Sequence, residues 1–311
     1  MALVPTAGAE QLGPLERAAG VVLGEKGIDT AGVCPPEVAA GPARNVDIPQ
    51  PIRRYTKAPV NTAGAELPGP LERARLRLKA VMAGTYETGI EPGYKQRSTP
   101  PTRDEPSELF RIYQPHMADR TVKELVTAAS LGQTAARLWN AQWIQLWGTL
   151  FLNKPCGVAQ KGNIGWHQDQ HYFTTIWEPK SEVFFASIAL SDIGPDSGPV
   201  MMIRGSHRWG YRGEGDFYGQ AMETVRKGVH IPEGEQWEEV ATTMPSGAVS
   251  FHHKNTFHGS LANHSGVPRL SILIFLRTEH SQPLPDSDSY WLQNIDDPEI
   301  CPVIYGDDGQ R

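Results

Sequence analysis

Residues 166–171 read Trp-His-Gln-Asp-Gln-His, and the rest of the chain is organised around this stretch. If the stretch is a β-strand, His167 and Asp169 are two residues apart and point to the same face of a sheet. An imidazole and a carboxylate placed in this way can hold two positions of a divalent metal ion. A second histidine from elsewhere would complete the two-histidine, one-carboxylate triad that leaves sites open on iron(II) for oxygen chemistry. A His-X-Asp tripeptide also arises by chance, so a metal site depends on what the rest of the chain supplies.

The third ligand has to come from a histidine further along the chain. Residue type alone leaves several candidates open, which are His207, His230, His252, His253, His258, His264 and His280. The stretch 250–263 narrows the set because it lies between two apolar, strand-like segments. Within it, His258 is followed by Gly259, and a glycine lets another backbone approach closely.

A charged residue opens the last strong apolar segment, 269–277. On a strand, Arg269 shares its face with Ser271 and Leu273. An arginine buried there needs an anionic partner, and a bidentate guanidinium–carboxylate pair is the natural one. If no acidic side chain faces Arg269, a dicarboxylate cosubstrate would serve.

Composition excludes several classes of protein. The chain has 311 residues, of which 39% are hydrophobic, enough for a substantial core. Its formal net charge of −6 gives no global basic field for nucleic acid or an anionic membrane. No apolar run approaches the about 20 residues of a membrane helix, and no signal peptide is recognisable. The three cysteines are far apart and match no zinc spacing, so we expect a reducing, cytoplasmic location.

The pattern along the chain changes from helical to extended at about residue 143. Residues 70–84 have the apolar spacing of a helix, and residues 120–139 predict one or two more, broken at Leu131-Gly132. Strand-like segments follow at 145–153, 182–191, 199–203, 247–252 and 269–277. Residues 205–245 show little pattern and predict an insertion of loops. We therefore expect an antiparallel double sheet supported by flanking helices.

The first 60 residues are rich in alanine, glycine and proline, and they predict an irregular segment ahead of a domain spanning 61–311. Residues 6–18 are nearly repeated at 62–74. The repeat is interpreted as two similar helix starts with proline in the first turn, rather than as a duplicated segment covering the domain.

Residues 70–278 resemble the phytanoyl-CoA dioxygenase family of iron(II)- and 2-oxoglutarate-dependent oxygenases. The matching blocks occur in family order and comprise Leu146-Trp147, Lys154–Gly157, Trp166–Gln170, Asp196–Pro199, Arg204–Arg208 and His258–Ser260 with Asn263 and Arg269. Three positions depart from the family pattern: Cys156 and Arg204 replace prolines, and Ala248 replaces an aspartate. None of the three is an expected metal ligand.

The resemblance implies a double-stranded β-helix, also called a jelly-roll or cupin-like core, with a specific site. His167, Asp169 and His258 would hold Fe(II), while Arg269 and Ser260 would bind the distal carboxylate of 2-oxoglutarate. Thr149 or Trp147 would line the cosubstrate pocket. Three more residues are candidates for contacts with substrate or for support of the ligands: Gln168, His171 and Trp209. By strand parity, His171 would share the face of the ligands and meet the substrate or act as a fourth ligand.

The implied activity is oxidation of a small organic molecule, most simply hydroxylation in secondary metabolism, with O2 consumed and succinate and CO2 released. Related halogenases replace the carboxylate ligand with a small residue, so Asp169 favours oxygenation. The alternatives are a cupin-like metal-binding protein or oxygenase that does not use 2-oxoglutarate, a zinc hydrolase, and a degenerate relative that only binds a partner. The sequence does not determine the oligomeric state or the substrate.

Overall fold

The computed structural model describes residues 69–93, 109–157, 162–217 and 221–307, together with the backbone of two short N-terminal strands. The irregular segment expected at 1–60 therefore lies largely outside the described residues, as does the first copy of the near-repeat. The second copy leads into helix α1, Pro70–Met82, which has proline at its start as predicted.

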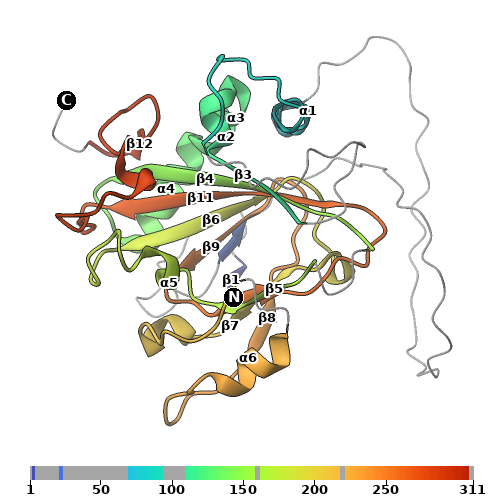
Figure 1. The fold of residues 1–311 in the computed structure, drawn as a ribbon, viewed down its shortest axis with the longest axis vertical. Coiled ribbons are helices and arrows are strands. Elements are labelled where there is room, and N and C mark those ends of the chain that lie inside the picture. Colours follow the sequence, from blue (N-terminus) through green and yellow to red (C-terminus); the bar gives the residue numbers. More distant parts are fainter. Residues whose placement is uncertain are drawn as a thin grey trace.

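Two mostly antiparallel sheets form the body of the protein (Figure 1). The larger sheet has β3 (Phe110–Tyr113) paired with β4 and otherwise follows the order β1 (Ala2–Leu3), β2 (Val21–Leu23), β9 (Val249–His253), β6 (Val183–Ala189), β11 (Arg269–Thr278), β4 (Ile144–Lys154) and β12 (Val303–Tyr305). The smaller sheet has the order β5 (Ile164–His167), β10 (His258–Ser260), β7 (Val200–Ile203) and β8 (Glu239–Ala241). The predicted class, mostly β with flanking helices and a jelly-roll core, is confirmed, although the sheets do not close into a barrel.

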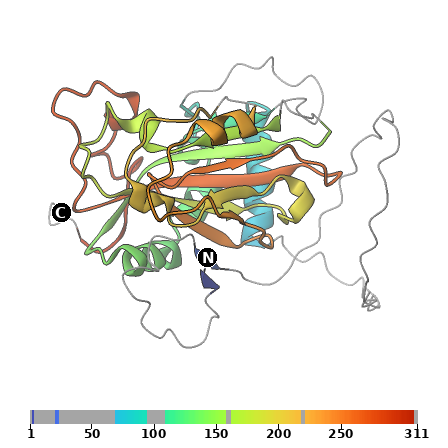
Figure 2. The same cartoon turned by 90° about the horizontal axis from the view of Figure 1, so that it is seen from below.

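Alternation along β11 explains how the larger sheet separates its two faces. Ile272, Ile274 and Leu276 belong to the main apolar core, whereas Arg269 and Phe275 lie on the other face. The long strands β4 and β11 run side by side across the sheet (Figure 2). The face of the larger sheet that holds Arg269 and Phe275 therefore presents polar and aromatic side chains toward the smaller sheet.

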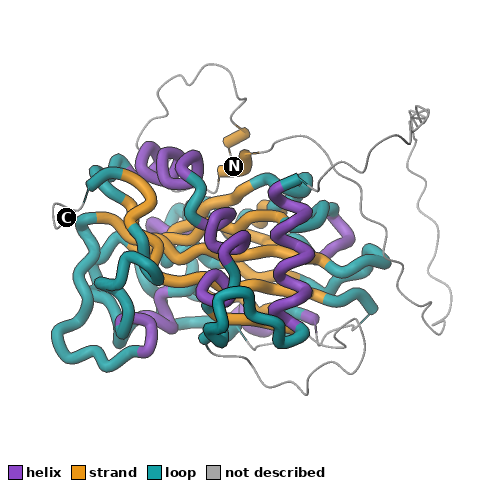
Figure 3. The backbone as a smooth tube through the Cα atoms, turned by 90° about the horizontal axis from the view of Figure 1, so that it is seen from above, coloured by secondary structure: helices purple, strands orange, loops and turns teal. Residues whose placement is uncertain are grey.

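Helices cover the apolar face of the larger sheet (Figure 3). They include α1, α2 (Pro115–Ala118), α3 (Arg120–Val126) and α4 (Ala129–Trp139). The expected break at Leu131-Gly132 is wrong, because both residues lie inside α4 and the helices separate at residues 127–128. Gly132 serves close packing instead, since a Cβ there would lie 2.4 Å from the carbonyl oxygen of Ile304. None of the helices in the described ranges is long and apolar enough to cross a membrane.

The segment 205–245 is more ordered than the predicted insertion of loops. It contains a 3₁₀ turn at Ser206–Trp209, helix α6 (Met222–Gly228) and β8, which pairs with β7. Its apolar side chains pack with Trp166 on β5 and with Phe257, which directly precedes β10. No local pattern predicted this order, because the packing joins residues that are far apart in the sequence.

Candidate active site

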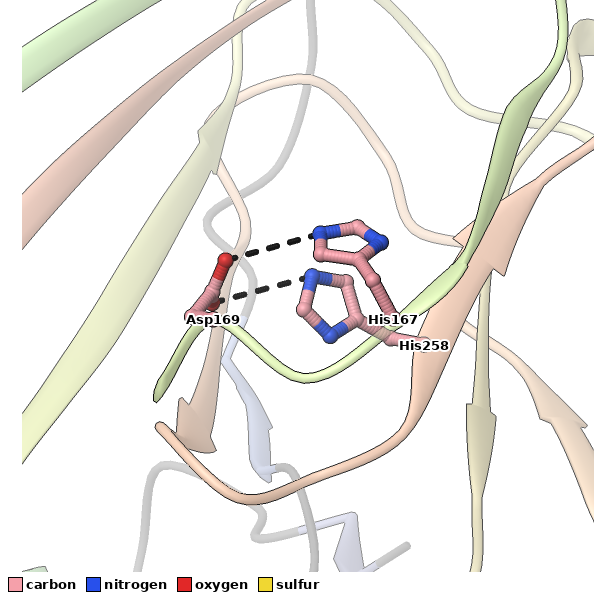
Figure 4. Close-up of side chains that lie close together, drawn as sticks. All are labelled: His167, Asp169 and His258. Atoms are coloured by element: carbon pink, nitrogen blue, oxygen red, sulfur yellow. Dashed lines mark ion pairs between the residues drawn. The ribbon is translucent and has the colours of Figure 1, made fainter. Parts of the chain in front are cut away.

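His167, Asp169 and His258 come together where β5 and β10 pair (Figure 4). His167 ends β5, and its Cα partner across the sheet is His258 at the start of β10. One ligand atom from each residue lies within 4.8 Å of the others. Gly259 allows the strands to approach, because a Cβ there would lie 3.0 Å from the carbonyl oxygen of Ile164.

Backbone carbonyls orient both imidazoles. Nδ1 of His167 lies 2.8 Å from the carbonyl oxygen of Gly165, and Nδ1 of His258 lies 2.9 Å from that of Thr256. With Nδ1–H donating in each ring, each Nε2 keeps its lone pair for a metal ion. Burial, followed by the neighbouring His167, lowers the pKa of His258 to about 3, which keeps the ring neutral as a metal ligand must be.

Asp169 reaches the site by a turn, not along a strand. Strand β5 ends at His167, and Asp169 has helical backbone angles, φ −58° and ψ −30°, ahead of helix α5 (Gln170–Phe173). Its Oδ1 lies 3.5 Å from Nε2 of His167, and its Oδ2 lies 3.7 Å from Nε2 of His258. Burial would raise the pKa of Asp169, but the surrounding imidazoles lower it well below its usual range, so the carboxylate is ionised.

A fourth histidine supports the carboxylate. His252, on β9, is buried, and its Nε2 lies 2.9 Å from Oδ2 of Asp169. Nε2–H donates this hydrogen bond, which orients the carboxylate beside the two ligand imidazoles. The sequence placed His252 only among the open candidates for a third ligand, because its contact with Asp169 depends on how β9 sits in the larger sheet.

Two buried cations lie together near Ser260. Arg269 and Lys154 are directly opposite each other on β11 and β4, and both are almost completely buried. Nζ of Lys154 donates to Oγ of Ser260 at 2.6 Å and to the carbonyl oxygen of Leu261 at 2.5 Å. Burial and then the charge of Arg269 lower the pKa of Lys154 well below its usual value, and burial lowers that of Arg269 to about 10.

This cationic pocket has the chemistry of a carboxylate site. Nε of Arg269 is buried without a hydrogen-bond partner, and no ion pair within the described residues neutralises Arg269 or Lys154. Two uncompensated buried charges are costly, so an anionic ligand fits here. In the sequence, Lys154 belongs to the stretch Lys154–Gly157, which predicts only a turn, and its alignment with Arg269 comes from the strand register.

The two β4 residues expected at the cosubstrate lie elsewhere. Thr149 is on the other face of β4, where its Oγ1 is 2.7 Å from Nδ1 of His116. Trp147 is completely buried in an aromatic cluster. Between Thr149 and Lys154 the register with β11 is regular, so alternation alone puts Thr149 on the face opposite Lys154. A β-bulge leaves Trp147 unpaired, since Phe275 pairs with Gly148 and Leu276 with Leu146, so Trp147 and Thr149 lie on opposite faces although they are two residues apart.

The three residues considered for supporting roles also separate. Gln168 is buried and ties the metal stretch to two loops, donating to the carbonyl oxygens of Gly210 and Asn255 and accepting from the amide of Arg212. His171 lies in α5, not on a strand, and is exposed, with Nδ1 2.9 Å from the hydroxyl of Tyr211. Trp209 packs in the apolar cluster outside the smaller sheet. Strand parity failed for His171 because the strand stops before it.

A cavity of about 930 Å³ opens beside Asp169. Its lining comprises Glu91, Pro92, Gly93, Arg111, Tyr113, Leu150, Asp169, Tyr172, Phe173, Phe217, Phe275, Tyr290 and Trp291. Phe217 lies next to the ligands, with its ring centroid 5.2 Å from that of His167. The metal site thus faces a space large enough for an organic molecule.

Fold and site together define a jelly-roll protein with a two-histidine, one-carboxylate metal site of the type that suits non-haem iron. The family profile described as phytanoyl-CoA dioxygenase (PhyH) matches residues 93–271, more than half of the chain. The chain belongs to this family.

Individual relatives are distant. The chain is 24% identical over 189 residues to a probable alpha-ketoglutarate-dependent hypophosphite dioxygenase of Stutzerimonas stutzeri, covering 58% of this chain and 62% of the relative. It is 24% identical over 209 residues to ectoine dioxygenase of Bordetella parapertussis, covering 63% and 66%. The chain thus matches less than two thirds of the length of either relative.

A solved structure shares the fold. The epimerase SnoN, in complex with Fe3+, alpha ketoglutarate and nogalamycin RO, has a TM-score of 0.52 and 18% identity, covering 71% of this chain and 82% of that chain. At this identity the match shows the fold alone.

Proposed function

We propose that this chain is an iron(II)- and 2-oxoglutarate-dependent oxygenase that oxidises, most simply by hydroxylation, a small organic molecule. The observation that carries the proposal is the pairing of a His167-Asp169-His258 cluster with a buried, unneutralised cationic pocket. The hypophosphite and ectoine relatives are dioxygenases by name, and SnoN, from nogalamycin biosynthesis, was solved with Fe3+ and alpha ketoglutarate. These names support the same chemistry, and the link of SnoN to nogalamycin biosynthesis supports a role in secondary metabolism.

The donor set fits iron(II), with two neutral imidazole nitrogens and one carboxylate oxygen. Bound there, iron(II) would couple the oxidative decarboxylation of 2-oxoglutarate by O2, which yields succinate and CO2, to oxidation of the substrate. The presence of Asp169 supports oxygenation rather than halogenation.

The residues of the chain have separate tasks in this proposal. The carbonyls of Gly165 and Thr256 hold the two imidazoles with Nε2 toward the site, and His252 holds the carboxylate of Asp169. Lys154, Ser260 and Arg269 bind the distal carboxylate of 2-oxoglutarate, which orients its 2-oxo acid end toward the metal. The cavity walls then position the substrate and limit access of water.

The runner-up is a cupin-like metal protein that does not use 2-oxoglutarate. Nothing in that function requires two buried cations opposite each other at one edge of the metal site, so Lys154 and Arg269 argue against it. The two functions differ in one measurable quantity, the dependence of turnover on 2-oxoglutarate. If Arg269→Ala left the apparent KM for 2-oxoglutarate unchanged, the runner-up would be favoured.

The proposal is tested by succinate formation with iron(II)-loaded protein. We expect succinate to require iron(II), 2-oxoglutarate and O2 together, and Asp169→Ala to lower the rate by about 100-fold or more. The matched control is Asp286→Ala, which changes an exposed carboxylate away from the site. Full turnover by Asp169→Ala with iron bound would show that the triad is wrongly assigned, and turnover without O2 would indicate a hydrolase.

A further inference from the structure

The cavity beside Asp169 is larger than a compact, polar substrate requires. Its volume of about 930 Å³ is near the upper end of the roughly 300–1,000 Å³ found for small-molecule sites. It extends from Asp169 at the metal site to Tyr290 and Trp291 in the 3₁₀ turn Tyr290–Leu292. An inorganic anion or a small amino-acid derivative would leave most of this space to water.

One wall of the cavity is a packed aromatic layer. The rings of Phe173, Phe275 and Trp291 have centroids 5.2, 5.3 and 5.8 Å from that of Trp147 behind them. Trp147 is completely buried, so this wall is held in place by the core. Such a preformed wall offers ring faces and edges to a ligand without a large cost in side-chain ordering.

Further aromatic side chains line the cavity beside Asp169. The amide of Phe217 donates to the hydroxyl of Tyr172 at 2.8 Å, which ties the segment before residue 218 to helix α5. The guanidinium of Arg111 lies over the ring of Phe217, with Cζ 4.9 Å from its centroid. Tyr172 and Tyr290 are 37% and 39% exposed, so their rings are accessible to a ligand in the cavity.

Charge is sparse among the described residues that line the cavity. Apart from Asp169, the charged ones are Glu91 and Arg111, which have opposite signs. A small, strongly polar molecule would lose hydration against aromatic walls and gain few hydrogen bonds in return, which is unfavourable. The phosphates of a coenzyme A ester would meet one cation, Arg111, among the lining residues that the structure describes.

We propose that the substrate is a flat, ring-rich and largely apolar molecule that lies against the aromatic walls, with one C–H bond toward the metal site. The inference rests on the proposed function, since the cavity matters for catalysis only if the site oxidises what enters it. The inferred substrate differs from hypophosphite and ectoine, although the relatives named as hypophosphite dioxygenase and ectoine dioxygenase are similar to this chain.

Binding to the iron(II)-loaded protein under anaerobic conditions, with 2-oxoglutarate present, tests the substrate class. The ring-rich probes are 2-(hydroxymethyl)anthraquinone and flavanone, and the comparison probes are ectoine, hypophosphite and palmitoyl-coenzyme A. We expect the ring-rich probes to quench tryptophan fluorescence with dissociation constants on the order of 10 µM, and ectoine and hypophosphite not to bind at about 1 mM. Tighter binding of any comparison probe than of both ring-rich probes would overturn the inference.

A matched pair of variants locates the binding. Tyr290 and Tyr305 are both 39% exposed, but only Tyr290 lines the cavity. Tyr290→Ala should weaken binding of the ring-rich probes by about tenfold, and Tyr305→Ala by less than about twofold. Phe217→Leu, at the other end of the cavity, provides a second variant should Tyr290→Ala fold poorly. Equal effects of the cavity and control variants would overturn the inference.

The two levels of the proposal fail in different ways. Succinate formation by the wild-type protein without added substrate tests the iron and 2-oxoglutarate chemistry alone. If succinate forms but the ring-rich probes do not bind, the substrate class is wrong and the proposed function stands. If no succinate forms under any condition, the proposed function is wrong, whatever the fluorescence assay shows.

Discussion

Replacement of Lys154 by methionine tests the cationic pocket with little change in side-chain shape. Lys154 lies opposite Arg269 and donates to Ser260, so its ammonium group is placed to meet the same carboxylate as the guanidinium. One hydrogen bond to a charged group contributes about 1.5–3 kcal/mol, and about 1.4 kcal/mol corresponds to tenfold in affinity. Lys154→Met should therefore weaken 2-oxoglutarate binding by roughly 10- to 150-fold, and Arg269 should preserve the remainder.

Calorimetric titration of 2-oxoglutarate into anaerobic, iron(II)-loaded protein measures this change directly. Thermal unfolding gives a second readout. At a concentration 100 times the wild-type dissociation constant, 2-oxoglutarate stabilises the wild type by about 2.7 kcal/mol, but a variant with 100-fold weaker binding by only about 0.4 kcal/mol. The control is Lys180→Met, which removes an exposed lysine. A dissociation constant within twofold of wild type for Lys154→Met would refute the assignment of the pocket.

Three further predictions follow from single side chains. His252→Phe removes the hydrogen bond to Asp169 and should weaken iron(II) binding by about 10- to 100-fold, as measured in competition with a chelator. The control His280→Phe changes an exposed histidine and should leave iron(II) affinity unchanged. Equal iron(II) affinities of the two variants would contradict the role of His252. Burial lowers the pKa of His116 from 6.5 to about 4, so the unfolded chain binds more protons than the folded chain between these pH values, and stability is lost as pH falls from about 6.5 toward 4. In urea unfolding, this loss of stability should be up to about 3 kcal/mol smaller in His116→Gln than in the wild type. Parallel plots of stability against pH for the two proteins would argue against this effect of His116. Burial raises the pKa of the Cys301 thiol to about 12, so iodoacetamide at pH 8 should modify Cys301 only after the protein is denatured. Mass spectrometry measures the modification. Rapid labelling of Cys301 in the folded protein would count against a buried thiol.

Local sequence patterns were enough for the strands and for much of the site. Segments such as 145–153 and 269–277 are strands because their apolar alternation is a property of the residues themselves. The pairing of His167 with Asp169, and of His258 with a glycine, is likewise visible in short stretches. Resemblance to the family selected His258 as the third candidate ligand and added Ser260 and the role of Arg269. The class of fold and the three candidate metal ligands were therefore accessible without coordinates.

Errors arose where one extra residue or an early strand end changed the geometry. Parity along a strand predicted that His171 would face the metal, but β5 stops at His167, and Asp169 arrives by a turn. The bulge at Trp147 in β4 similarly places Trp147 and Thr149 on opposite faces, although they are two residues apart. A local pattern cannot specify such irregularities, because a single inserted residue reverses every later side chain.

The sequence by itself determined the stretch 166–171 as half of a candidate metal site, because ligand chemistry requires particular residue types at short spacing. Only the tertiary structure decided that His252 supports Asp169, that Lys154 joins Arg269, and that an aromatic cavity opens beside them. The physical reason is that these neighbours are brought together by strand register and by packing between segments far apart in the chain. Such contacts are set by the whole core, so they leave no periodic signal in the residues that make them.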